Sequence, residues 1–164
     1  MNKKILVIAF AIMFVAMLAA PVLANSPKKI PVTATQLAVP SPGPDTKSWT
    51  TKGGIAQMKN LVGAGIATLN IPGEASLEGS CTASLDATTN SKIEVGIWHS
   101  YVKWIFATGT FEGVVKMKTF MEEGVREFHA VLHGTDAFEG WKLNLDGECP
   151  RTGPMNWEGF LLIP

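Results

Sequence analysis

The chain has 164 residues, of which 46% are hydrophobic and 17% are charged, and its 14 basic residues balance its 14 acidic residues. This length suffices for one domain with its own core. The sequence has no basic cluster of the kind that nucleic-acid binding requires, so no nucleic acid is expected as a partner.

The first 24 residues have the pattern of an export signal. Lys3 and Lys4 give a basic start, residues 5–20 form an unbroken apolar run, and Val22-Leu23-Ala24 matches a small-residue cleavage site. The alternative is an uncleaved anchor, although the run is short for a membrane span of about 20 residues. No Cys follows the cleavage point, so a lipid anchor is not expected. The sequence predicts cleavage after Ala24, a secreted or extracytoplasmic protein, and no stable membrane span after cleavage.

Cleavage would leave residues 25–164, whose 12 basic and 14 acidic residues give a net charge of 12 − 14 = −2. Residues 25–48 are a Pro-rich N-terminal segment, in which proline excludes helix. Within it, 32–39 is a possible first strand and 40–47 a stiff surface loop. Residues 49–164 are expected to form the folded domain.

The only two cysteines, Cys81 and Cys149, both belong to the exported part. An even pair in an oxidising compartment predicts one disulfide, which would close a long loop and stabilise the fold by roughly 4 kcal/mol. The alternative is two free thiols, since spacing along the chain does not show the geometry that a bridge needs.

Strand signals are frequent from Trp49 onward. The clearest lies at 75–87, where apolar and small residues alternate with polar ones, as in a strand with one buried and one wet face. The residues between predicted strands are turn formers, and 147–154 reads as a loop. The pattern predicts eight or nine strands and no helix, with strands at 32–39, 55–61, 65–71, 75–87, 92–106, 114–120, 125–133, 141–145 and 156–163.

A repeat helps to choose among all-β architectures. An apolar residue followed by Glu-Gly occurs at 77–79, 111–113, 138–140 and 157–159, each time at a predicted strand. Glycine inside a strand marks a bend or a close backbone approach, and small barrels use it to turn their corners. A closed barrel also removes the exposed edges of a sheet. The repeat therefore favours a barrel, with the aromatic residue before Glu plugging one end.

The stretch Gly134-Thr135-Asp136-Ala137-Phe138-Glu139-Gly140 resembles the Gly-Thr-Gly-x-Phe-x-Gly turn of allene-oxide-cyclase-type barrels, a superfamily that includes the plant dirigent proteins. The resemblance covers about residues 109–145 and implies a small antiparallel, calycin-like, eight-stranded β-barrel with a central cavity, often trimeric. Asp136 stands where the pattern usually has Gly. The sequence has no counterpart of the cyclase or dirigent active-site residues, so neither activity carries over.

Candidate binding residues cluster at 98–104. Tyr101 is the only tyrosine and shares strand parity with His99, so the two could form a polar patch in a cavity lined by aromatic residues such as Trp98 and Trp104. The four residues are the predicted ligand-binding set. The alternative for His99 and Tyr101 is an outward polar face.

Other residue types give no site. His129 and His133 would share a strand face about 13 Å apart, too far for one ion, so no metal and no cofactor are expected. The glutamates of the repeat, Glu78, Glu112, Glu139 and Glu158, are read as outward acids rather than as paired acid–base groups.

Three functions from different classes remain. The first is non-enzymatic binding of a small apolar molecule in the barrel. The second is a homo-oligomeric structural or assembly protein of the cell envelope. The third is a cofactor-free isomerase or cyclase that uses His99, Tyr101 or a buried Glu inside a cavity.

Overall fold

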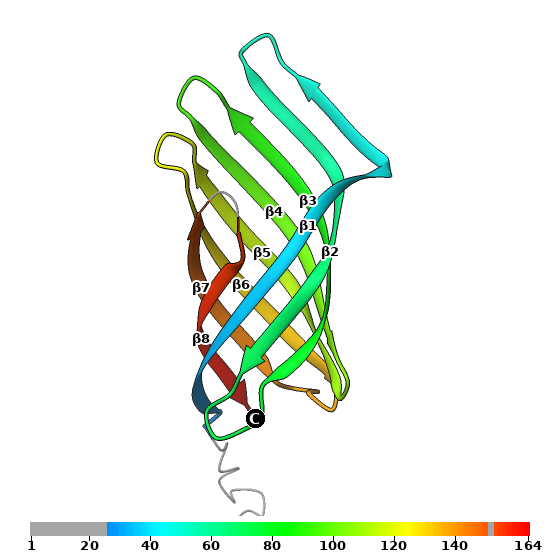
Figure 1. Cartoon of the computed structure of the whole chain (residues 1–164), viewed down its shortest axis with the longest axis vertical. Helices are drawn as coiled ribbons and strands as arrows, with labels where there is room; N and C mark the ends of the chain where they lie inside the picture. The colour runs from blue at the N-terminus through cyan, green and yellow to red at the C-terminus, as the bar shows by residue number, and fades with distance from the viewer. Residues whose placement is uncertain (1–25, 151–152) are drawn as a thin grey trace, which may run out of the picture.

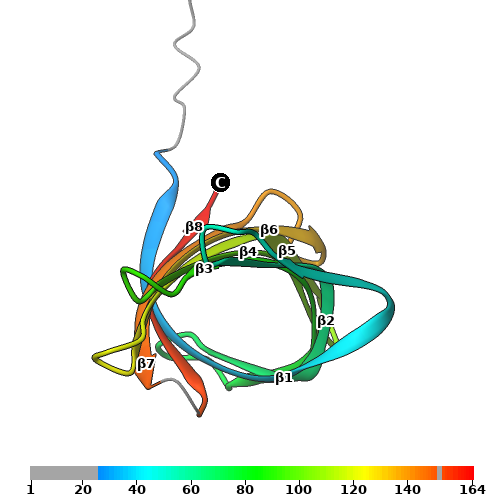
Figure 2. The same cartoon turned by 90° about the horizontal axis from the view of Figure 1, so that it is seen from above.

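The computed structural model describes residues 26–150 and 153–164; the predicted export signal lies outside these residues. The described chain is all-β, and its eight strands close into an antiparallel ring in sequence order (Figures 1 and 2). No helix in this part is long and apolar enough to cross a membrane. The strands are β1 (Lys28–Thr50), β2 (Ile55–Asn70), β3 (Leu77–Asn90), β4 (Val95–Phe106), β5 (Gly109–Phe120), β6 (Val125–Asp136), β7 (Lys142–Pro150) and β8 (Met155–Ile163).

The prediction of an all-β chain is confirmed, but several strands begin or end at other residues than expected. The two strands expected at 55–61 and 65–71 are one strand, β2, because the glycines between them continue the ladder instead of breaking it. Residues 147–150, expected in a loop, belong to β7 and pair with β6. Alternation of apolar and polar residues therefore located the strands, whereas the glycines inside β2 were wrongly taken as the end of a strand.

The boundary predicted between residues 48 and 49 is wrong, since the Pro-rich segment is most of β1. This strand pairs with β8 over Lys28–Gln36 and with β2 over Thr33–Thr50, with a register shift between Pro42 and Lys47. Beyond Gln36 the strand has a neighbour on one side only. Proline is tolerated there because a donor that faces away from the sheet has no ladder partner to lose.

Aromatic side chains close the end of the barrel opposite the β1–β2 hairpin. Phe138 stacks on Phe111 with ring centroids 4.7 Å apart and meets Phe106 edge-on at 6.4 Å. A second layer follows further inside, where Trp157 lies 6.1 Å from Trp104 and 4.3 Å from Phe128. These rings are buried, so the aromatic plug expected from the repeat is present.

Inward-facing glycines let neighbouring strands approach closely. A side-chain carbon at any of six strand positions would overlap a backbone carbonyl oxygen of another segment: Gly65, Gly79, Gly113, Gly134, Gly147 and Gly159. Three of them are the glycines of the Glu-Gly repeat. The repeat therefore marks the points of close strand approach that curve the sheet.

The fourth copy of the repeat lies in the β6–β7 turn and not in a strand. The turn is closed by hydrogen bonds from Phe138 N to Thr135 O (3.1 Å) and from Gly134 N to Trp141 O (2.9 Å). Asp136 has a φ of 57°, in the left-handed region that favours glycine and that Asp tolerates better than most residues. This is the position at which the turn pattern that this stretch resembles has Gly.

Replacing Gly113 with Ala should destabilise the barrel. The new methyl group would overlap the carbonyl oxygen of Val131, and forced overpacking of this kind costs about 1–3 kcal/mol. The free energy of unfolding, measured by urea titration, should fall by that amount. Gly53→Ala is the control, because its nearest atom, Thr51 Oγ1, is 3.7 Å away and an exposed change of this kind stays within about 0.5 kcal/mol. Equal stability of the two variants would contradict the close-approach account.

Candidate functional site

The open half of the barrel contains a cavity of about 80 Å³ above the aromatic layers. The cavity is bounded by inward residues of β1 to β6 and by Gly153 and Met155 at the start of β8. The walls from β1 to β3 leave room for the cavity because Ala38, Gly63 and Ala83, which line it, have small side chains or none. The remaining lining is mostly apolar, with Leu85, Val102, Val115, Met117 and Met155.

Gln36 lies between the cavity and its aromatic floor and is 2% exposed. Its Oε1 accepts a hydrogen bond of 3.1 Å from Nε1 of Trp104. An indole N–H can only donate, so the amide oxygen must face Trp104, and the amide –NH₂ is left for the cavity. Trp104 therefore lies in the floor and orients a cavity residue without lining the cavity itself.

Arg126 and Trp98 form the polar side of the cavity. Arg126 lies on β6 at the same strand parity as Phe128, so its side chain faces inward, and its Cζ is 5.8 Å from the Trp98 ring centroid. That distance is within the range of a cation–π contact. Gly96 makes room for the indole, since a side-chain carbon there would lie 3.1 Å from Trp98 Nε1.

Several buried polar atoms in this region have no hydrogen-bond partner within the described residues. Trp98 Nε1, Ser100 Oγ and Arg126 Nε belong to residues that line the cavity, and Thr119 Oγ1 lies beside them, opposite Arg126 in the β5–β6 register. Trp157 Nε1 in the aromatic floor is a fifth such atom. Unpartnered buried groups are uncommon in folded proteins and cost about 1–3 kcal/mol each, so these atoms lower the stability of this half of the barrel. They have almost no accessible surface, so none of them faces free space in the cavity directly.

The charge of Arg126 has no counterion in the interior. The buried polar side chains of the described chain are Gln36, Ser100, Thr110 and Thr119, and no carboxylate is among them. The ion pairs found in this part, Lys103–Glu112 and His129–Asp146, lie on the outside. Of the described residues that line the cavity, Arg126 alone carries a charge, which is positive.

The structure corrects half of the predicted ligand-binding set. His99 and Tyr101 are exposed on the outer face of β4, Tyr101 at 50%, because they have the opposite parity to the inward-facing Trp98. The pKa of Tyr101 is raised by local desolvation and by the neighbouring Glu112 carboxylate. Of the four residues, only Trp98 lines the cavity, and Trp104 contributes through Gln36.

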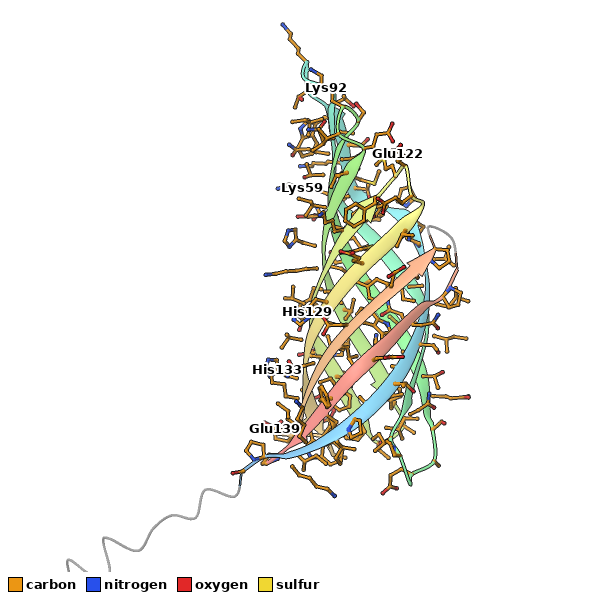
Figure 3. All side chains as sticks on the ribbon, turned by 90° about the vertical axis from the view of Figure 1, so that its left-hand side faces the viewer. Lys59, Lys92, Glu122, His129, His133 and Glu139 are labelled. Atoms are coloured by element: carbon orange, nitrogen blue, oxygen red, sulfur yellow. The ribbon has the colours of Figure 1, made fainter. Side chains whose placement is uncertain are left out.

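The acid–base candidates are also outside the barrel. Glu78, Glu139 and Glu158 are exposed, Glu112 is partly exposed and pairs with Lys103, and His129 and His133 project from the outer face of β6 (Figure 3). The described residues contain no group of three potential metal ligands. The residues named for an isomerase or cyclase therefore cannot act inside this cavity.

The predicted disulfide is absent, and Cys81 and Cys149 are both buried free thiols. They lie on β3 and β7, which are exactly opposite in a ring of eight strands. Such a ring is roughly 16 Å across, given strands about 4.8 Å apart and tilted by about 40°. A disulfide needs Cα atoms within about 7 Å, so these two walls are too far apart for a bridge.

No family model, curated protein or solved structure matches this chain.

Sequence reasoning missed Arg126, Gln36 and Ser100 as cavity residues. Arg126 follows a hairpin and looks like an exposed charge at a strand end. Its parity with Phe128, Ala130 and Leu132 was the available signal, because every second residue of β6 from Arg126 faces inward.

Two thiols per chain should be found in unfolded, unreduced protein, and neither should react readily in the folded state. Burial raises the pKa of Cys81 from 9.0 to about 11 and also raises that of Cys149, the latter opposed by the charge of Arg126. Only the thiolate reacts, so modification of folded protein by a disulfide reagent should be slow at pH 8 and should accelerate toward pH 11. Stability should fall over pH 9 to 11, because the unfolded chain releases the Cys81 proton first.

Thiol titration with and without denaturant provides the measurement, and intact mass provides the control. Absence of free thiols in the unreduced denatured chain, with a mass lower by two hydrogens, would contradict the assignment.

Proposed function

We propose that this protein is an exported barrel that binds a small, largely apolar molecule in the open half of its interior. The observation that carries the proposal is the cavity of about 80 Å³, which has apolar walls and a few inward polar groups. That combination is typical of small-molecule sites. The volume corresponds to roughly five to eight water-sized groups, the size of a single ring or a short branched chain.

The end of the β1–β8 pairing beside the cavity supports this function. β8 begins at Met155, opposite Gln36, whereas β1 continues to Thr50, so the two strands are not paired beside the cavity. Gly153 and Met155 line the cavity at this point. We propose this point as the place where a ligand enters, because no β1–β8 ladder has to break there.

The architecture also fits the allene-oxide-cyclase type of barrel. The β6–β7 turn has its left-handed residue at Asp136, where the pattern of that superfamily has Gly, and Phe138 closes the end of the barrel. Export rests on the sequence of residues 1–24. Membership of this calycin-like superfamily and secretion both belong to the proposal.

Blocking the cavity should abolish binding of a neutral ring-sized ligand. Toluene, added to isotope-labelled protein, should shift the NMR signals of the Trp98 indole and the Ser100 amide with a dissociation constant of about 1 mM, the affinity expected for seven heavy atoms. Ala83→Leu fills the cavity and should remove the shifts. Ser84→Leu adds the same bulk to the outer face of β3 and should leave them unchanged. Unaltered binding to Ala83→Leu would refute the site.

A second function, assembly of like chains, is favoured by one surface. The outer face of β1 and β2 carries Leu37, Val39, Val62 and Ile66, exposed at 52%, 67%, 43% and 61%. Leu37 is directly opposite Ile66 in the β1–β2 register, so the apolar groups are contiguous. An uncharged face can meet its own copy in a symmetric contact without repulsion, and contiguous exposed apolar patches mark interaction sites.

Ile66→Glu should convert an oligomer to monomer, measured by sedimentation velocity at high protein concentration. The buried carboxylates would be desolvated without partners and would repel one another. Ile93→Glu is the matched control, because Ile93 is equally exposed, at 65%, but lies in the β3–β4 hairpin. A wild-type monomer at high concentration would end the assembly hypothesis.

A further inference from the structure

We infer that the cavity recognises a monocarboxylate with a compact apolar body, and that Arg126 and Gln36 bind the carboxylate. The inference rests on the proposed ligand-binding function and specifies its chemical class.

The polar groups that line the cavity are mainly hydrogen-bond donors. The Arg126 guanidinium can only donate, and the contact with Trp104 leaves Gln36 with its –NH₂ toward the cavity. Trp98 Nε1, Ser100 Oγ and Arg126 Nε have almost no accessible surface, so the donors that can meet a ligand are the terminal N–H groups of Arg126 and the Gln36 amide. Donor groups from β1 and β6 thus line one space, and a wall of this kind is complementary to an acceptor.

The positive charge of Arg126 also favours an anionic ligand. Arg126 is partly buried, and the described interior holds no carboxylate to neutralise it. The Trp98 ring provides one cation–π contact at 5.8 Å, which leaves the in-plane N–H groups of the guanidinium without an anionic acceptor. Arginine N–H groups form paired hydrogen bonds with a carboxylate, and such charge-assisted bonds are about twice as strong as neutral ones.

The charge and the apolar walls of the site fit a carboxylate better than a phosphate ester. Among the described residues the site has one cation and neutral donors, which matches a single negative charge; a phosphate ester would bring up to two. The other walls are apolar, with Leu85, Val115 and Met117 among them, so the rest of the ligand should be hydrocarbon. The volume of about 80 Å³ limits the enclosed part to about the size of one ring.

Benzoate and its neutral isostere benzamide test the inference on the full mature protein, followed by calorimetry at neutral pH and by the Trp98 indole NMR signal. Wild-type protein should bind benzoate at least about tenfold more tightly than benzamide, since hydrogen bonds to a charged group are worth more than neutral ones. In Arg126→Gln the preference should disappear, and toluene should still bind as in the wild type.

Lys116→Gln is the matched control. It removes the same charge from the exposed outer face of β5, where salt screens its effect on the interior, so the benzoate preference should change by less than about twofold. Far-ultraviolet circular dichroism confirms folding of each variant, and the wild-type comparison of acid with amide needs no variant at all.

The outcomes are distinguishable. Equal binding of benzoate and benzamide to the wild type would overturn the inference, while toluene binding would leave the proposed function standing. A benzoate preference that survives in Arg126→Gln and vanishes in Lys116→Gln would overturn it too, because the attraction would then come from the outer surface. Failure of all three molecules to bind would refute the inference together with the proposed function.

Discussion

The close approach of neighbouring backbones at inward-facing glycines is the constraint on which this barrel depends. At Gly113 and Gly159, for example, the carbonyl oxygens of Val131 and Asn144 occupy the space that a side chain would need. A sheet with side chains at every inward position would be held further apart and would curve less. Closure of eight strands around one core, and hence the existence of an interior, follows from these positions.

The interior is divided between a packed aromatic half and a half that contains the cavity. Trp104, Trp157 and Phe128 pack against one another in the middle of the barrel and separate the aromatic end from the cavity. Because Trp104 also donates to Gln36, the packed layer sets the orientation of a polar group above it. The packing of the aromatic half therefore maintains the geometry of the half that contains the cavity. There the described side chains of Trp98, Ser100 and Arg126 have polar atoms without a hydrogen-bond partner.

The sequence predicted the class of fold better than the site, for physical reasons. Alternation over 75–87 identified β3, and the Glu-Gly repeat indicated a curved, closed sheet, because both are local signals. The Cys81–Cys149 pairing failed because it depends on which strands are opposite in the ring, and that is not a local property. His99 and Trp98 were assigned to one cavity although adjacent strand residues face opposite sides, so strict use of parity would have removed His99 and added Arg126.

The unequal lengths of β1 and β8 leave part of β1 without a paired strand on one side. Where β8 has not yet begun, β1 carries Pro40 and Pro42, which lack the N–H that a passing strand would need for pairing. Such an edge is a poor template for a strand of another molecule, so the prolines protect this barrel against edge-to-edge aggregation.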